Sequence, residues 1–188
     1  MDAHLFLTGF MGSGKSTIGK SLARRMNKPF IDTDDQIEKK LKMEIIDIFA
    51  KYGEAWFRDY EEKVVEDLVS ATDKAVISLG GGTLLSQKTT GLILKSGFLI
   101  FIRSRPEEIW KRIKHSTRRP LLSPENEVWE KQEFLKRTAI LLKQREKGYN
   151  AAQLCIDRDG KEVAEIVDEI KTHLNRYDLH WQNGNTPV

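Results

Sequence analysis

Residues 5–17 read LFLTGFMGSGKST, and this stretch decides which fold the chain can adopt. It contains G-x-x-x-x-G-K-S after an apolar run, and Ile18, Leu22 and Met26 follow at helical spacing. A phosphate-binding loop requires this context, with a strand before it and a helix after it. Its glycines let successive N–H groups point at one anion, and the helix adds the positive end of its dipole. The stretch predicts a nucleoside triphosphate site formed by Gly12, Ser13, Gly14, Lys15, Ser16 and Thr17.

Two side chains of this loop carry specific chemistry. Lys15 can reach the β- and γ-phosphates as a point charge, and the hydroxyl of Ser16 can coordinate Mg²⁺. The alternative is a plain glycine-rich turn whose following helix is capped by Ser16 or Thr17. The complete pattern with both flanks favours the phosphate-binding loop over that turn. The loop indicates the donor of a phosphate but leaves its acceptor open.

The bulk composition is that of one soluble globular domain. The chain has 188 residues, of which 39% are hydrophobic and 31% charged, and its net charge of +3 is too small to imply a nucleic-acid binder. The lone Cys155, in an apolar run that we expect to be a buried strand, allows neither an internal disulfide nor a thiolate metal site. No apolar run approaches membrane-spanning length, and a first strand that starts by His4 or Leu5 leaves no room for a signal peptide. We expect a cytoplasmic monomer that binds neither nucleic acid nor membranes.

Apolar stretches alternate with helical patterns along the rest of the chain. After the first strand, further strands are expected near residues 29–32, 75–79, 98–102 and 154–157. These strands are continuously apolar, so both faces of the sheet must be covered. We predict a three-layer α/β/α fold of the P-loop NTPase type, with a central parallel sheet of about five strands. A single domain is expected over residues 1–176, with a lid at about 112–124 and a loosely ordered tail at 177–188.

Two acids leave the carboxyl end of the second predicted strand, the edge where the phosphate loop must also lie. Asp32 and Asp34 are two residues apart, so they face the same side of an extended segment. Such carboxylates can hold Mg²⁺ through water or accept a hydrogen bond from an attacking hydroxyl. The alternative is that Asp34 or Asp35 caps the next helix. We assign Asp32 to the metal shell and Asp34 to the acceptor.

Three glycines close the next strand at the same edge. Gly80, Gly81 and Gly82 leave bare N–H groups and room for a small ligand, whereas a plain loop would need one glycine. Upstream, Arg58 precedes Glu61 and Glu62 by three and four residues, a spacing that an ordinary surface ion pair would explain.

Arg145 lies on the apolar stripe of a helix expected at about residues 128–147. It follows Leu141 and Leu142 by four and three residues. An inward-facing arginine needs an anionic partner, and a ligand carboxylate matches its two-pronged guanidinium. Snorkelling at the helix end is an equally good explanation for Arg145 taken alone.

Arg112, Arg118 and Arg119 surround a basic, proline-punctuated loop. A nucleic-acid patch of the single-strand type would interleave aromatic residues, and none are present here. The loop instead fits a lid that closes over ATP, excludes water and places a guanidinium against the transferring phosphate.

Taken together, these segments resemble shikimate kinase. The matching features are the loop at residues 9–17, Asp32-Thr33-Asp34, Phe57-Arg58-Asp59-Tyr60-Glu61, Gly80-Gly81-Gly82, Arg119-Pro120-Leu121-Leu122 and the helix end from Arg145 to Tyr149. They occur in the family's order over about residues 5–170. The loop alone is shared by a vast superfamily, but the combination of the other motifs is specific.

The resemblance implies an enzyme of aromatic amino-acid biosynthesis that uses MgATP to phosphorylate the 3-hydroxyl of shikimate. It implies that Lys15, Asp34 and Arg119 are catalytic. Shikimate would be bound through its hydroxyls by Asp34, through its carboxylate by Arg58 and Arg145, and by the backbone of residues 80–82.

The resemblance also implies the residues around the nucleotide. Ser16 and Asp32 would organise Mg²⁺, Arg112 would lie over the adenine, and Arg158 is a candidate for a second adenine contact. Phe49, Phe57 and Glu61 would support the acceptor pocket.

The chain departs from the family pattern in two places. Many members have proline and leucine before the tyrosine at the Arg145 helix end, where this chain has Glu146-Lys147-Gly148-Tyr149. The lid carries a doubled arginine, so Arg118 can replace Arg119.

Three other functions compete with this one. Another small-molecule kinase on the same scaffold, such as a gluconate kinase, shares the loop and the lid. A nucleotide-dependent switch is disfavoured because D-x-x-G at residues 157–160 comes late and no N-K-x-D follows. A non-catalytic homologue is disfavoured because Lys15, Ser16, Asp32, Asp34 and Arg58 are all present.

Overall fold

The computed structural model describes residues 3–70, 73–114 and 130–182. Its strands are β1 (His4–Thr8), β2 (Phe30–Asp32), β3 (Val76–Ser78), β4 (Gly97–Arg103) and β5 (Leu154–Asp157). Its helices are α1 (Lys15–Met26), α2 (Thr33–Leu41), α3 (Ile45–Ser70), the 3₁₀ turn η1 (Thr83–Leu85), α4 (Gln87–Ser96), α5 (Pro106–Ile113), α6 (Lys131–Tyr149) and α7 (Val163–Gln182).

The five strands form one parallel sheet in the order β2-β3-β1-β4-β5. β1 lies in the middle, where Leu5 pairs with Val76 of β3 on one side and with Phe98 of β4 on the other. After β1 the chain forms β2 and β3 on one side of it, and then β4 and β5 on the other side. Ligands bind at such a switch point, outside the carboxyl ends of the strands. The predicted three-layer fold is confirmed.

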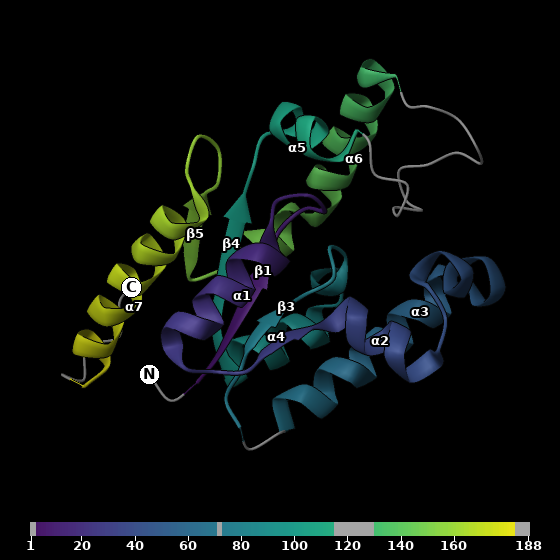
Figure 1. The fold of residues 1–188 in the computed structure, drawn as a ribbon. Coiled ribbons are helices and arrows are strands. Elements are labelled where there is room, and N and C mark those ends of the chain that lie inside the picture. Colours follow the sequence, from purple (N-terminus) through teal and green to yellow (C-terminus); the bar gives the residue numbers. More distant parts are fainter. Residues whose placement is uncertain (1–2, 71–72, 115–129, 183–188) are drawn as a thin grey trace.

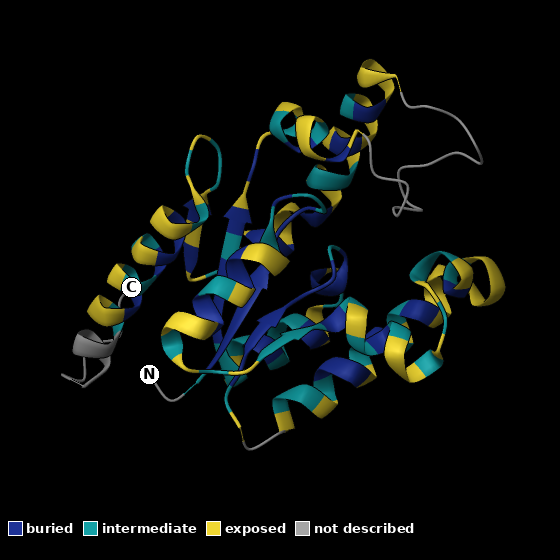
Figure 2. Cartoon of the chain, viewed as in Figure 1, coloured by how far each residue is buried: buried dark blue, intermediate teal, exposed yellow. Residues whose placement is uncertain are grey.

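Successive side chains of β1 enter opposite layers, as the period of a strand requires. Leu5 and Leu7 pack in the cluster that α1 and α7 cover, whereas Phe6 packs in the cluster that α3 and α4 cover. All five residues of β1 are buried (Figure 2). A strand buried on both faces explains the continuous apolar run that predicted a covered parallel sheet.

Two satellite cores flank the carboxyl ends of the strands. In one, Ile37 of α2 packs against Ile48, Phe57 and Val64 of α3. In the other, Phe10 of the phosphate loop packs against α5 and α6. Figure 1 shows α2 and α3 on one side of the strand ends and α5 and α6 on the other. The site lies between the α2–α3 pair and the α5–α6 pair.

Helix α3 is interrupted by a kink at Gly53. Gly53 has φ 81° and ψ 167°, so it separates a first segment that starts at Ile45 from a second one that carries Phe57 and Arg58. A residue with a side chain rarely adopts this positive φ, which is why glycine stands at the kink.

Two details differ from the sequence-based expectations. Cys155 is exposed, so the prediction that it is buried is wrong. β5 is an edge strand on which Leu154 and Ile156 face α7 while Cys155 points away from that core. The last helix continues to Gln182, beyond the expected end of the domain at residue 176.

None of the helices within the described ranges is long and apolar enough to cross a bilayer. Most of the predicted lid, at about residues 112–124, falls outside the described residues.

Candidate functional site

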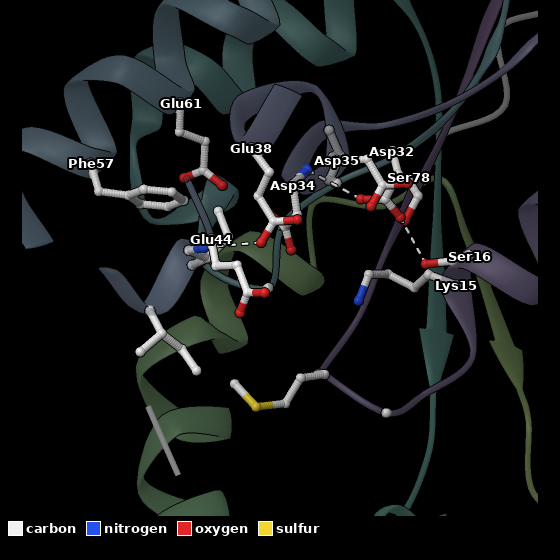
Figure 3. A pocket seen from close by; sticks show the side chains of 18 of the residues that line it. Lys15, Ser16, Asp32, Asp34, Asp35, Glu38, Glu44, Phe57, Glu61 and Ser78 are labelled. Atoms are coloured by element: carbon white, nitrogen blue, oxygen red, sulfur yellow. Dashed lines mark hydrogen bonds between the residues drawn. The ribbon is translucent and has the colours of Figure 1, made fainter. Parts of the chain in front are cut away.

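A cavity of about 620 Å³ opens at the carboxyl ends of β1, β2 and β3. Its walls come from the phosphate loop, the start of α2, both segments of α3, the glycine triplet, the end of α5 and α6. In Figure 3, Lys15 and Ser16 lie on one side of it, while Asp34, Glu38, Glu44 and Glu61 reach in from the other. Most of the predicted donor and acceptor residues therefore line one cavity, whereas Ser13 and Arg158 do not.

The phosphate loop leads into α1, whose N-terminus has no side-chain cap. Gly14 is the N-cap of α1 in the left-handed region (φ 94°), and no side chain caps its amide groups. Such N–H groups, together with the helix dipole, bind anions. Lys15 lies beside them, and its Nζ donates to the carbonyl oxygen of Gly9 at 2.9 Å. The loop is thus arranged for phosphate, with its lysine turned back across it.

Gly9 has to be glycine because of its neighbour in the sheet. A Cβ on it would lie 2.5 Å from the carbonyl oxygen of Ile102 in β4. Real Cβ atoms do not approach backbone so closely, so the loop can leave β1 along this path only without a side chain.

Asp32 connects the loop to α2. Its Oδ2 accepts a 2.7 Å hydrogen bond from the hydroxyl of Ser16, and its Oδ1 accepts the N–H of Asp34 at 3.1 Å, capping α2. The capping residue is therefore Asp32, whereas the sequence suggested Asp34 or Asp35. Capping uses Oδ1 and leaves Oδ2 of Asp32 beside the hydroxyl oxygen of Ser16, where these two oxygens can serve a metal.

Asp34 is set apart from the other acids by its surroundings. Burial raises the pKa of its carboxyl to about 7, with further contributions from the negative charges of Asp32 and Glu61. Lys15 and Arg58 oppose this increase in pKa. A carboxyl that titrates near neutral pH inside a cavity suits a proton acceptor.

Each glycine of the triplet faces a different functional side chain. A Cβ on Gly80 would meet Oε1 of Glu61 and lie 2.8 Å from Oδ1 of Asp34. One on Gly81 would lie 3.1 Å from Nη1 of Arg145, and one on Gly82 would lie 2.5 Å from Nη2 of Arg58. The three glycines thus make room for four side chains that were predicted separately. This juxtaposition explains why one glycine would not suffice.

Arg58 forms the ion pair that its spacing suggested, and it also reaches the cavity. Its Nη1 donates to Glu61 at 2.7 Å and its Nη2 to Glu54 at 3.2 Å, and its guanidinium lies 5.1 Å from the ring centre of Phe57. Glu61 is 2% exposed and also accepts from the hydroxyl of Thr83. A buried carboxylate that holds an arginine beside a cavity differs from an ordinary surface pair.

Arg145 is buried, with 4% of its surface exposed. Its Nε and Nη1 have no hydrogen-bond partner among the described residues. Its guanidinium lies 5.3 Å from the ring centre of Phe10 and lines the cavity. The alternative of snorkelling at the helix end is therefore wrong, because the guanidinium points inward.

Of the residues predicted to contact the nucleotide, Arg112 lines the cavity and Arg158 does not. Nη1 of Arg112 donates to the carbonyl oxygen of Gly12 at 3.3 Å. Arg158 contacts the start of α1, where its Nε would lie 3.6 Å from a Cβ on Gly14, and its Nη1 donates to the carbonyl oxygen of Lys161. Ser13, a residue of the loop itself, is fully buried. Arg118 and Arg119 lie outside the described residues.

Several residues of the site were not singled out from the sequence. Thr33 accepts the N–H of Gly80 at 2.9 Å and Thr83 donates to the carbonyl oxygen of Gly80, so both fix the triplet. Glu38 and Glu44 line the acceptor side of the cavity. Glu38 lies in the helix that follows Asp32 and Glu44 lies just before α3, so no strand end marked either residue in the sequence.

Comparisons with known proteins agree with this geometry. The family model for shikimate kinase matches residues 11–175. A shikimate kinase of Chlorobium phaeobacteroides is 40% identical over 174 residues, which cover 92% of this chain and 87% of the relative. The structure of an Acinetobacter baumannii shikimate kinase in complex with shikimate superposes with a TM-score of 0.85 at 28% identity, covering 94% of this chain and 95% of the other.

The rival assignment is more distant. A gluconokinase from Sinorhizobium meliloti has a TM-score of 0.54 at 18% identity, covering 96% of this chain and 97% of the other, which indicates a shared fold alone. The phosphate loop, the glycine triplet with its arginines and the matched family model agree with one another, and the chain belongs to the shikimate kinase family.

Proposed function

We propose that this protein transfers the γ-phosphoryl group of MgATP to the 3-hydroxyl of shikimate. The observation that carries the proposal is Arg145, a buried guanidinium with unpartnered N–H groups in the same cavity as an open phosphate loop. Leaving such donors unpaired costs about 1–3 kcal/mol each. A small acid that supplies a carboxylate would remove that cost, and ATP would occupy the loop beside it.

On the acceptor side, Arg58 and Arg145 would bind the carboxylate of shikimate. Both guanidinium groups border the glycine triplet, at Gly82 and Gly81 respectively. A planar carboxylate matches the fork of an arginine, and the backbone of the triplet allows a small ring to approach closely. Phe49 and Phe57 line the same part of the cavity and would contact the apolar ring edge.

On the donor side, the amide groups at the start of α1 and Lys15 would bind the phosphates. Ser16 and Asp32 would hold Mg²⁺, since a hydroxyl and a carboxylate 2.7 Å apart fit an ion that keeps water and phosphate oxygens as its other ligands. The metal would neutralise charge on the phosphates. Arg112 and Arg158 would contact the nucleotide, and Arg119 would close over the phosphates from the lid.

The chemistry follows from these positions. Asp34 would accept the proton of the attacking hydroxyl, because its pKa of about 7 leaves an effective base at neutral pH. Lys15 and Arg119 would stabilise the negative charge of the transferring group. Catalysis would rest on alignment and electrostatics, with no covalent intermediate on the protein. Since one chain supplies all of these side chains, a monomer would suffice.

A coupled assay of ADP release tests the acceptor directly. Shikimate, gluconate and nucleoside monophosphates are supplied in parallel with MgATP, and turnover is expected with shikimate. Turnover with gluconate and none with shikimate would overturn the proposal.

A variant tests the carboxylate clamp. Arg58→Ala is expected to weaken shikimate binding about 10- to 100-fold, as loss of charge-assisted hydrogen bonds does, while ATP binding persists. Arg25→Ala removes an exposed arginine that pairs with Asp168, and it should leave both affinities unchanged. Unchanged shikimate affinity in Arg58→Ala would refute the clamp.

A further inference from the structure

The carboxylate of Asp159, in the loop between β5 and α7, is bonded to residues of the β4–α5 segment. Its Oδ1 accepts from the Ser104 hydroxyl at 2.5 Å and from Nη2 of Arg112 at 3.2 Å. Its Oδ2 accepts from the backbone N–H of Arg105 at 2.8 Å and from that residue's Nε at 3.2 Å. The side chain is 13% exposed, so these contacts replace most of its water.

Asp159 is ionised at neutral pH despite this burial. Burial acts to raise the pKa of its carboxyl, but the hydrogen bonds from Ser104, Arg105 and Arg112 outweigh it and lower the pKa. The loop therefore presents a fixed negative charge to Arg112.

Arg112 connects Asp159 to the phosphate loop, because it donates hydrogen bonds to both. Its Nη1 donates to the carbonyl oxygen of Gly12 at 3.3 Å and to the Ser104 hydroxyl at 3.0 Å. Arg112 lines the cavity, whereas Asp159 does not. Asp159 thus contacts Arg112 from outside the cavity. Without its charge, Arg112 would keep Ser104 and Gly12 as acceptors, and both are neutral.

We propose that Asp159 is a positioning residue for nucleotide binding, which acts by fixing Arg112 against the phosphate loop. An arginine held in one rotamer loses less conformational freedom when it meets a ligand, so the anchored side chain binds more tightly. The hydrogen bonds that Arg112 donates to Ser104 and Gly12 set its orientation, and the charge of Asp159 keeps it there. This inference rests on the proposed function, because it takes the donor side of the cavity to be the nucleotide site.

The chain offers a matched control for the loss of an acid–arginine pair. Asp157 lies two residues earlier at the end of β5, and its two oxygens accept from Nε and Nη2 of Arg103 at 2.5 and 2.7 Å. That pair is exposed, at 58% for Arg103 and 56% for Asp157. Asp157→Ala therefore removes a carboxylate of the same strand end without touching Arg112.

The test measures ADP and shikimate affinities of the full chain by isothermal titration calorimetry. Asp159→Ala is expected to weaken ADP binding about tenfold, the effect of one charge-assisted contact, and to leave shikimate affinity within about twofold. Asp157→Ala should leave both affinities within about twofold. Asp159→Asn, which keeps the size of the side chain and one neutral acceptor oxygen for either Ser104 or Arg105, should still weaken ADP binding and serves if the alanine variant does not fold.

A double-mutant cycle separates positioning from a general structural role. If Asp159 acts through Arg112, the variant that combines Asp159→Ala with Arg112→Ala binds ADP no more weakly than Arg112→Ala alone. Effects that multiply in the double variant would overturn the inference, as would unchanged ADP affinity in Asp159→Ala and Asp159→Asn. A wild-type protein that binds ADP but does not phosphorylate shikimate would refute the proposed function alone, whereas one that binds no ADP would refute both.

Discussion

Replacement of Gly82 by alanine probes the acceptor site with one methyl group. The added Cβ would lie 2.5 Å from Nη2, 2.6 Å from Cζ and 2.8 Å from Nη1 of Arg58. Gly82 itself has φ −111° and ψ −2°, a conformation that alanine can adopt without strain. The change therefore acts on Arg58 rather than on the backbone.

The size of the effect follows from these distances. Ordinary van der Waals contact begins near 3.4 Å, so the guanidinium has to retreat by about 1 Å from the cavity. A guanidinium displaced this far loses its charge-assisted hydrogen bonds to the ligand carboxylate, which are worth about 1.5–3 kcal/mol, or roughly 10- to 100-fold in affinity. Because the guanidinium is the far end of a flexible side chain, we expect the free energy of unfolding to change by less than about 1 kcal/mol.

Calorimetric titration of shikimate, with thermal unfolding in parallel, measures both quantities. Gly82→Ala should weaken shikimate binding about 10- to 100-fold while ADP affinity is retained. Gly91→Ala is the matched control, since a Cβ there meets nothing within 4 Å; in the middle of α4 it should stabilise the fold by about 1 kcal/mol and leave binding unchanged. Shikimate affinity in Gly82→Ala equal to that of wild type would refute the reasoning.

Three further predictions follow from the buried ionisable groups. Arg145→Met removes unpartnered donors, so the free energy of unfolding should stay within about 1 kcal/mol of wild type or rise, while calorimetry should detect at least a roughly 100-fold loss of shikimate affinity; a large loss of stability would contradict this. Because the pKa of Asp34 is raised to about 7, kcat/KM should fall as the pH drops below about 7, and Asp34 should reduce stability as the pH rises from about 4 to 7; Asp34→Asn should therefore abolish turnover and raise the Tm at pH 8. Burial, with Lys74 and Lys28, lowers the pKa of His4, so its contribution to stability is full above about pH 6.5 and is lost as the pH falls below that value; His4→Asn should weaken this acid dependence in urea unfolding between pH 5 and 8.

Local patterns in the sequence determined the fold and the donor side of the site. The loop at residues 9–17 works through backbone geometry and one helix start, and both depend on residues that are neighbours in the chain. The same holds for Asp32 and Asp34, because the end of a parallel strand marks the ligand edge before any packing is known. For these residues, the pattern alone was enough to predict the position.

Prediction became weaker where a residue's partner lies far away in the sequence. Arg145 was equally consistent with an inward or a snorkelling position, and its burial against Phe10 decided between them. Cys155 was expected inside because its run is apolar, yet β5 lies at the edge of the sheet and the side chain is exposed. Strand order is a property of the whole chain, so a local run cannot specify which strand is at an edge.

The amino-acid sequence by itself determined the parallel sheet, the phosphate loop and the residue types of the acceptor site. Tertiary structure alone decided that Gly80 faces Glu61 and Asp34, that Gly81 and Gly82 face Arg145 and Arg58, and that Asp159 accepts a hydrogen bond from Arg112. It also decided the raised pKa of Asp34, which depends on burial and on the charges around it. The physical reason is the separation of the interacting residues along the sequence. Backbone conformation follows from neighbouring residues, whereas side-chain contacts, burial and electrostatics depend on segments that only the fold brings together.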